Sequence, residues 1–429
     1  MTRPRKARQT QQSQTEGVTA PSVLDAPLAR ETETRVLVRT NCTLAGVKRR
    51  QGEWMMAPSE AVAGWEAGNL VASQATIDRV WAAAGRILTP DTVPSQQTAV
   101  PYDPTALKVL QITAYDPGSS VYRYHSAANT VPGVVSALVR YAHNNPHCDL
   151  RQWDAEVDAA TVALLYLTAD VVHSHMDYYV QRNVLREGGR PGLMQALTYH
   201  GSVDPANPAG SIRVNAGGAD DQMDAVVFGA RPYHHRFKVK HWLPIPMPVA
   251  DYQAIRKNEM PGSRKGRTFR VAHSPTRRSI KGTAEFLRAC DFLTMQQGIK
   301  VEPVLIEGME HGAALRLKAS CDAVFDSFWL GMQGSGLEGG AMGLPVLAGD
   351  PEAQADLLKL GIEVPWTIAN DEYGIREQLA RLATDATFHK QEAERVHAYV
   401  VAHHDYAVVG AKYATILTEA KRNGPPYRS

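Results

Sequence analysis

Short apolar runs alternate with helical patterns along most of this chain of 429 residues, and this alternation restricts its possible folds more than any other feature. One series begins with the run LKVLQIT at 107–113, and a second begins with RTFRVAHSPT at 267–276. Strands that alternate with helices predict parallel, doubly wound sheets. The sequence therefore predicts an α/β protein with two Rossmann-like halves.

Each series predicts several elements in order. In the first, residues 107–142 predict a strand, a loop and a helix, TVALLYLTADVVHSH predicts a helix that leads into a strand, and further strands are expected in GLMQALTYHGS, MDAVVFGA and HRFKVKHWLPIP. In the second, the strand FRVAH is followed by a helix over 281–297, the strand VEPVLIEG, a helix over 311–320 and the strand DAVFDSF. Residues 385–420 predict a segment that is helical over most of its length, and its apolar stripe through Val396, Tyr399, Val400 and Tyr406 or its neighbours is expected to pack across both halves.

Changes in composition divide the chain into segments. Residues 1–34 are polar and basic and predict a disordered, solvated arm, and the proline-rich residues 88–106 predict a linker. Between them, residues 35–87 predict a small α/β module with a helix from Ser59 that closes at Gly68. The remaining segments are expected to be an N-terminal domain over 107–265, a C-terminal domain over 266–395 and a C-terminal helix and tail over 396–429.

Composition excludes several classes of protein. The formal net charge is only +2, so the chain as a whole is not a general binder of polyanions. Its four cysteines lack the paired spacing of a zinc or redox site and fit a reducing cytoplasm. No apolar run reaches the roughly 18 residues that span a bilayer, and none follows the basic start as a signal peptide would require.

Two loops carry residues suited to phosphate. In SPTRRSIKG, residues 274–282, the cations Arg277, Arg278 and Lys281 stand where a strand gives way to a helix, so fixed charge adds to the helix terminus. In the second loop, glycines permit close approach of a ligand to the backbone, and a serine offers a hydroxyl. The first amides of the following helix are suited to hold phosphate. A carboxylate on that helix is suited to accept hydrogen bonds from the two hydroxyls of a ribose. These residues are Gly334, Ser335, Gly336, Leu337 and Glu338. The alternatives are ordinary surface cations and a carboxylate that interacts only with the helix dipole.

The segments SPTRRSIKGTAEFL, VLIEG, ASCDAVFDSF and GSGLEGGAMGLPVLAGD, in this order and spacing, resemble the C-terminal domain of nucleotide-sugar glycosyltransferases of the B-type fold. ADVVHSH followed by LTYHGS is similar to segments that face the acceptor in that family, so the resemblance spans roughly residues 107–420. It implies two Rossmann-like domains facing a cleft, with the small N-terminal module in addition. It also implies a retaining, metal-independent transfer from a nucleotide-diphosphate sugar such as a UDP-sugar, with no cofactor.

The resemblance assigns roles to individual positions. Lys281 matches a lysine that contacts the donor diphosphate, and Arg277 or Arg278 would be its arginine partner, although both lie closer to Lys281 than in the family. Glu338 matches the second of two glutamates seven residues apart, the one that binds ribose. The first of that pair falls at Leu330, which leaves open how the sugar's own hydroxyls are held.

On the other domain, His200 matches a histidine that approaches the reacting sugar or the acceptor in several members of the family, so Lys281, Arg278 and His200 are the predicted catalytic residues. The alternative for His200 is a structural role at the end of a strand. Gly118, Ser119 and His175 are expected on the acceptor side. The pairs of histidines in the chain lack the spacing of a zinc site, so no metal is expected.

The acceptor is left open between a modified base of phage DNA, a virion protein, and a glycan or small molecule. The module at 35–87 resembles small N-terminal domains of tailed-phage proteins and is expected to dock a partner protein, in which case the cytoplasm would be that of the host. Two other hypotheses remain: a non-catalytic phage structural or interaction protein on the same fold, and a sugar-nucleotide epimerase.

Overall fold

The computed structural model describes residues 33–85, 100–113, 119–140, 159–175, 193–199, 227–229, 241–260, 262, 266–327, 331–359 and 361–423. Most of the predicted arm and of the predicted linker, together with Gly118, His200 and Leu330, lies outside these residues. No helix in the described part of the chain is long and apolar enough to cross a membrane.

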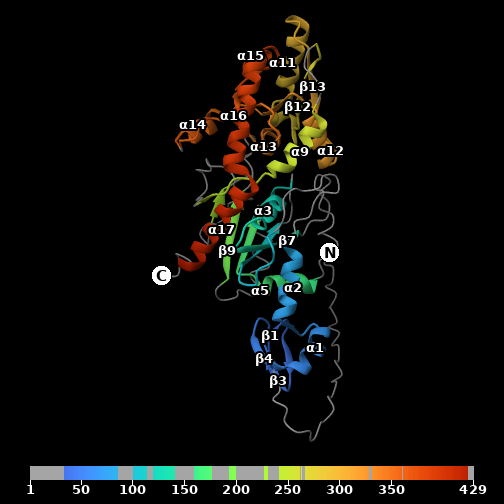
Figure 1. Ribbon diagram of the computed structural model, residues 1–429, viewed down its shortest axis with the longest axis vertical. Coiled ribbons are helices and arrows are strands. Elements are labelled where there is room, and N and C mark those ends of the chain that lie inside the picture. Colours follow the sequence, from blue (N-terminus) through green and yellow to red (C-terminus); the bar gives the residue numbers. More distant parts are fainter. Residues whose placement is uncertain are drawn as a thin grey trace, which may run out of the picture.

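The small N-terminal module lies at one end of the molecule (Figure 1). Its strands are β1 (Glu33–Val38), β2 (Cys42–Leu44), β3 (Val47–Arg49), β4 (Trp54–Pro58) and β5 (Val71–Ser73), and β1 lies between β4 and β5 in an antiparallel sheet. Helix α1 (Ser59–Ala67) closes at Gly68 as predicted, and Val36, Val38 and Val62 form the centre of a small core beneath it.

Helix α2 (Gln74–Ala84) packs between this module and the first large sheet. The side chain of Trp81 is fully buried, and its Nε1 donates a hydrogen bond to Oγ1 of Thr168 at 2.8 Å. Ile77 and Trp81 share one hydrophobic cluster with Leu110 and Val135 of that sheet. Because α2 contributes to the core beneath the sheet, side-chain packing holds the module against the first domain, in addition to the covalent linker that follows.

The first large sheet is parallel, with the strand order β11-β10-β9-β8-β6-β7 among the described residues. Its elements are β6 (Leu107–Thr113), α3 (Ser120–Ala128), β7 (Val134–Arg140), α5 (Ala159–Thr168), β8 (Val171–His175), β9 (Met194–Tyr199), β10 (Val227–Gly229) and β11 (His241–Trp242). The predicted strands β6, β8, β9, β10 and β11 are confirmed, as is the helix that leads into β8.

One predicted element of this sheet is wrong. Residues 107–142 were expected to end in a helix, but the helix α3 is short, and the end of the segment forms β7, paired in parallel with β6 from Leu107↔Val134 to Thr113↔Arg140. The run VVSALV is rich in β-branched residues and follows a turn at Gly133, whose φ is 89°. Both features favour a strand over a continued helix.

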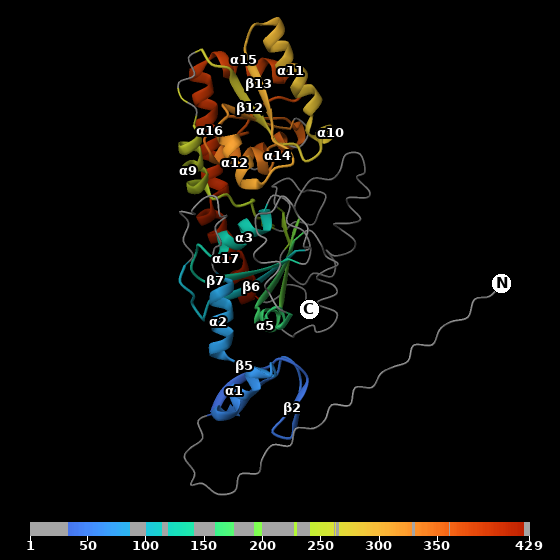
Figure 2. The same ribbon diagram turned by 90° about the vertical axis from the view of Figure 1, so that its right-hand side faces the viewer.

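The second large sheet has the parallel order β13-β12-β14-β15-β16 within the described residues and lies at the far end of the molecule from the module (Figures 1 and 2). Its elements are α9 (Val249–Glu259), β12 (Phe269–His273), α10 (Arg278–Lys281), α11 (Thr283–Gln296), β13 (Val301–Leu305), α12 (His311–Ala319), β14 (Ala323–Ser327), α13 (Gly334–Ala341), β15 (Val346–Ala348), α14 (Pro351–Lys359) and β16 (Thr367–Ile368). The predicted helix over 281–297 is interrupted at its start by Gly282, whose φ of 70° separates α10 from α11. Two parallel sheets, each with its own helices, confirm the predicted α/β fold.

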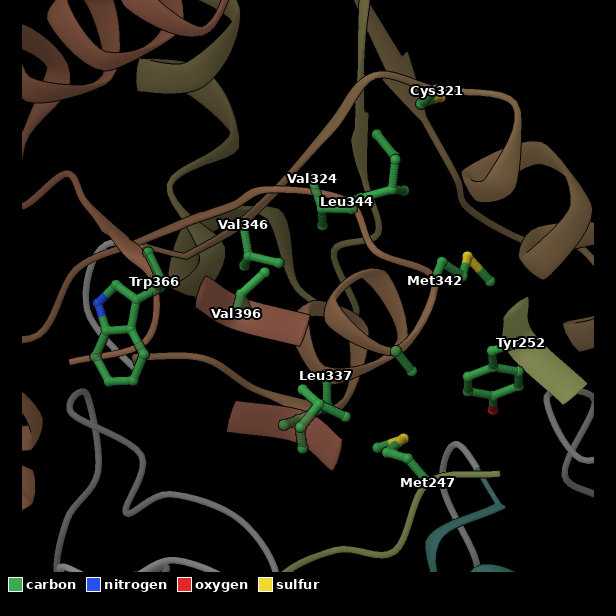
Figure 3. Packing of buried hydrophobic residues seen from close by; sticks show 14 of the residues in the cluster. Met247, Tyr252, Cys321, Val324, Leu337, Met342, Leu344, Val346, Trp366 and Val396 are labelled. Carbon is green, nitrogen blue, oxygen red and sulfur yellow. The ribbon is translucent and has the colours of Figure 1, made fainter. Parts of the chain in front are cut away.

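Three helices end the described chain: α15 (Glu372–Thr384), α16 (Ala386–His404) and α17 (Tyr406–Asn423). Helix α15 packs on the second sheet, and α16 and α17 connect the two sheets. Val396 and Val400 on α16 belong to the core around α13, part of which is drawn in Figure 3. Val409 and Tyr413 on α17 belong to a cluster with β6 and α3 of the first sheet. The prediction that this tail packs across both halves is confirmed.

A buried histidine, His273, lies on an interior strand of the second sheet. His273, at the end of β12, places Nδ1 3.0 Å from the carbonyl oxygen of Phe325 and Nε2 2.8 Å from Oγ1 of Thr283. Burial, with a further contribution from nearby Lys281, lowers the pKa of His273 to about 4. An unfolded histidine has a pKa of about 6.5, so as the pH falls between these values the unfolded chain binds a proton that the folded chain does not.

We therefore expect this contribution to the free energy of unfolding to be fully present above about pH 6.5 and to be lost as the pH falls through about 4, by roughly 3 kcal/mol in total. His273→Gln should be less stable than the wild type at pH 7 but should show a smaller further loss on acidification. Urea denaturation at a series of pH values measures both. Parallel pH profiles for the two proteins would contradict this assignment.

Candidate functional site

The two loops that the sequence singled out open at the same edge of the second sheet. The first follows β12 and leads into α10, and the second follows β14 and leads into α13. Strands β12 and β14 are neighbours and run parallel, with Val271 paired to Ala323. Since the carboxyl ends of parallel strands lie at one edge, this edge is where an open α/β sheet binds its ligands.

Lys281 pairs with Asp326, a residue that was not predicted to belong to the site. Its Nζ lies 2.9 Å from Oδ1 of Asp326 near the end of β14, and both residues are buried. The other oxygen of Asp326 accepts hydrogen bonds from the amide of Gln333 and, at 3.1 Å, from the amide of Gly336. Asp326 therefore caps the first turn of α13 and neutralises Lys281 at the same time.

The two glycines of the second loop have different surroundings. A Cβ atom on Gly336 would lie 2.7 Å from Oδ2 of Asp326 and 2.6 Å from Cγ of Met332, so glycine is required here for the approach of the chain's own carboxylate. A Cβ atom on Gly334 would have no described atom within 4 Å. Of these two glycines, Gly334 is the one beside which the described residues leave space for a ligand.

Leu337 packs in the hydrophobic core of the second domain. Its side chain belongs to the buried core, where Figure 3 shows it with Met342 and Val396, and its amide donates to the carbonyl oxygen of Gln333 at 2.9 Å. Ser335 offers a hydroxyl, but in this structure Oγ of Ser335 accepts a hydrogen bond from Nζ of Lys318 at 2.9 Å. The amides of Gly336 and Leu337 and the Ser335 hydroxyl thus have partners in the protein.

The arginines of the first loop lie on the surface. Arg278 makes a two-point ion pair with Glu307, with Nε 2.9 Å from Oε1 and Nη2 2.5 Å from Oε2. Arg277 is also exposed and precedes the first residue of α10 in an extended conformation. Lys281 is buried beside α13 whereas both arginines face solvent, so the structure does not gather the predicted cations around one point.

Glu338 is the most heavily paired carboxylate of this edge. Its Oε2 lies 2.5 Å from Nζ of Lys318, and its Oε1 lies 2.6 Å from Nη2 of Arg123 and 3.1 Å from Nε2 of His311. Burial alone would raise the pKa of Glu338, but Lys318, the hydrogen bond from His311 and the charge of Arg123 outweigh burial and hold this pKa well below its usual range. Glu338 is therefore ionised at neutral pH.

Arg123 joins this site from the first domain. It lies on α3 and is buried, and its Nη2 also donates to the hydroxyl of Tyr252 on α9 at 2.9 Å. Burial opposes its charge, but the neighbouring Tyr252 and Glu338 outweigh this effect and raise the pKa of Arg123. The sequence gives no local signal for this role, because Arg123 reaches Glu338 only through the packing of two domains.

The predicted acceptor-side residues have structural contacts where they are described. His175, at the end of β8, is fully buried, with Nε2 2.9 Å from Oε1 of Gln111 and its ring centroid 4.1 Å from that of His173. Ser119 is buried immediately before α3, with a φ of 55°. Gly118 and His200 lie outside the described residues. Within the residues that the structure describes, no group of three or more His, Cys, Asp or Glu side chains is placed to hold a metal ion.

No protein-family model matches the sequence, and no curated protein matches it. Solved structures with a similar arrangement include α,α-trehalose 6-phosphate synthase from Burkholderia multivorans, at 13% identity and a TM-score of 0.49, covering 74% of this chain and 99% of that one. HepE from Anabaena in complex with UDP and glucose matches at 12% identity and a TM-score of 0.48, covering 73% of this chain and 99% of that one. Sucrose-phosphate synthase from Thermosynechococcus elongatus matches at 11% identity and a TM-score of 0.47, covering 74% of this chain and 100% of that one.

The pair of Lys281 and Asp326 predicts a measurable coupling. Asp326→Asn keeps an oxygen for the α13 amides but leaves the buried Lys281 cation without its counter-charge, so we expect a loss of about 3 kcal/mol in the free energy of unfolding. Adding Lys281→Met removes that cation and should recover part of the loss. Chemical denaturation of both single variants and the double variant measures the coupling.

A matched control is available on the surface. Glu394→Gln breaks the exposed pair between Lys390 and Glu394, whose N–O distance is 3.7 Å, and should cost about 0.5 kcal/mol or less. If the losses of Asp326→Asn and Lys281→Met simply add, the two side chains are not coupled and the description of this pair is wrong.

Proposed function

We propose that the protein is a glycosyltransferase that moves a sugar from a nucleotide-diphosphate sugar to an acceptor hydroxyl. Two residues 57 positions apart in the sequence carry the proposal: Lys281 pairs with Asp326, which caps the first turn of α13, and Glu338 lies on α13 itself. Both therefore lie toward the edge where an open parallel sheet binds its ligands. The order and spacing of the motifs that resemble B-type glycosyltransferases point to the same two residues.

The charge of the site also supports an anionic substrate. Three buried cations, Lys281, Lys318 and Arg123, lie around the start of α13, and each is paired with Asp326 or Glu338. A diphosphate forms charge-assisted hydrogen bonds with such side chains. These cations favour a nucleotide-sugar donor over an uncharged ligand.

In the proposed reaction, the bond between the sugar and the diphosphate breaks, and negative charge grows on the leaving diphosphate. Lys281, with Arg277 or Arg278, holds this charge more tightly than in the ground state, and Glu338 holds the ribose through its hydroxyls. His200 approaches the sugar from the other domain, while Gly118, Ser119 and His175 belong to the acceptor side. Retention of the anomeric configuration is part of the proposal and rests on the motif resemblance.

The acceptor stays open within the proposal, between a modified base of phage DNA, a virion protein, and a glycan or small molecule. The N-terminal module is proposed to dock a partner protein. Its packed attachment through Trp81 would hold such a partner in a fixed position relative to the first sheet. Mass spectrometry of DNA and of virion proteins after co-expression distinguishes the acceptors.

A second candidate function is a non-catalytic interaction protein on the same fold. It is favoured by one observation: Glu338 and Lys281 both have complete ion pairs within the chain, as residues of purely structural importance would have. This hypothesis predicts no nucleotide binding, whereas the transferase requires it. An epimerase would also bind a nucleotide sugar, but it would convert the sugar without an acceptor.

Donor binding is the decisive test. Incubation with a panel of UDP-, GDP- and ADP-sugars should raise the melting temperature with one member, followed by release of the nucleoside diphosphate when an acceptor is present. Lys281→Met and Glu338→Gln should each weaken donor binding or turnover by at least about tenfold, equivalent to about 1.4 kcal/mol. Titration calorimetry and release assays, run well below the melting temperature of each variant, measure these effects.

Matched control variants lie on the outside of the same domain. Lys390→Met and Glu302→Gln change the same residue types at positions whose side chains are 76% and 50% exposed, and they should leave the affinity unchanged. If no member of the panel stabilises the protein, the transferase proposal fails. If the donor binds but both site variants bind it as the wild type does, the site is misplaced.

A further inference from the structure

Arg123 is the point at which the first domain reaches the proposed donor site. It lies on α3, which packs against α17 and β7 beside the first sheet, yet its guanidinium contacts Glu338 on α13, Tyr252 on α9 and His311 on α12. Helices α9, α12 and α13 pack together on the second sheet. The contact between Arg123 and Glu338 is therefore an ion pair between two domains, and it is buried from solvent.

The ion-pair partners of Glu338 come from different domains. Lys318 and His311 both lie on α12, so they belong to the same domain as Glu338 and would stay with it in any movement of one domain against the other. Among the described partners of Glu338, Arg123 alone comes from the first domain. Separation of the domains would break the pair with Arg123 and leave the pair with Lys318 intact.

The carboxylate has limited capacity to accept further hydrogen bonds. Each of its oxygens has about two acceptor sites. Arg123 and His311 already occupy Oε1, and Lys318 contacts Oε2 at 2.5 Å. Two adjacent ribose hydroxyls need two acceptor sites of suitable geometry. One site on Oε2 remains, so a ribose that uses both hydroxyls displaces Arg123 or His311 from Oε1 of Glu338. Of these two, Arg123 is the one that a movement of the first domain would remove.

The chain crosses between the domains close to this contact. The segment before α9 and the junction of α16 with α17 run side by side, where the amide of Met247 donates to the carbonyl oxygen of His404 at 2.6 Å and the amide of Tyr406 donates to that of Met247 at 3.2 Å. Nη1 of Arg123 lies 3.5 Å from Sδ of Met247. Arg123 thus lies beside the two segments through which the chain passes between the domains. A change in the angle between the domains would therefore alter its distance from Glu338.

We propose that Arg123 is an interdomain latch, which competes with the donor ribose for Glu338 and so couples entry of the donor to separation of the two domains, before the first domain returns toward the bound sugar. The inference rests on the proposed function insofar as Glu338 is taken as the ribose-binding carboxylate. The affinity of a site that only part of the population exposes is reduced by that fraction. Removal of Arg123 therefore increases the exposed fraction and tightens donor binding.

Arg123→Met tests the latch, because methionine keeps much of the apolar stem without the charge. Small-angle scattering without nucleotide should show a larger radius of gyration than that of the wild type. Titration calorimetry with UDP, GDP and ADP should show a Kd about threefold or more lower for the nucleotide that binds the wild type. Arg123→Lys, which retains charge but not the two-partner geometry, should shift both quantities less and in the same direction, and it replaces Arg123→Met if that variant does not fold.

Lys318→Met is the matched control, since it removes a cation from the same carboxylate within one domain and should leave the radius of gyration unchanged. An unchanged radius of gyration for both Arg123 variants overturns the latch whatever the nucleotides do. Weaker nucleotide binding by Arg123→Met overturns it as well and makes Arg123 a donor contact. If no nucleotide binds the wild type or any variant, the proposed function fails, while an increased radius of gyration still supports the latch between the domains.

Discussion

The buried carboxylate of Glu338 is held from both domains at once at the edge of the second sheet where we propose that the donor binds. Lys318 and His311 hold it from within its own domain, and Arg123 holds it from the other. Such a carboxylate is stable in a poorly solvated position only while its partners stay in place, because an unpaired buried charge is far more costly than a paired one. The position of α3 relative to α13 is therefore tied to the charge state of one side chain.

The first turn of α13 has a second carboxylate with a related role. Asp326 caps this turn through the amides of Gln333 and Gly336 and pairs with Lys281 from the neighbouring loop. A helix N-terminus attracts anions, and here the chain supplies one itself. A diphosphate that binds beside Lys281 meets a site whose amides are partly occupied, which leaves the space at Gly334 as its approach.

Much of the second domain follows from local patterns. The apolar run of β12, the glycine-rich start of α13 and the placement of Lys281 and Glu338 at one edge of a parallel sheet are all predictable, because strand ends and helix starts are set by nearby residues. The strand β7 was not predicted, because its apolar run was expected to form part of a helix. The three valines of VVSALV are β-branched and favour a strand. Asp326 had a readable signal, a carboxylate near the end of a buried strand just before a glycine-rich loop. Arg123 had none, since its partner lies 215 residues away and in another domain.

A structure of the protein in complex with a nucleoside diphosphate would show directly whether Glu338 and Lys281 bind the donor. We expect the ribose hydroxyls on the Glu338 carboxylate, the diphosphate between Lys281 and the start of α13, and the guanidinium of Arg123 withdrawn from Oε1. A nucleotide bound elsewhere, with the pairs of Glu338 and Lys281 unchanged, would contradict the proposed site.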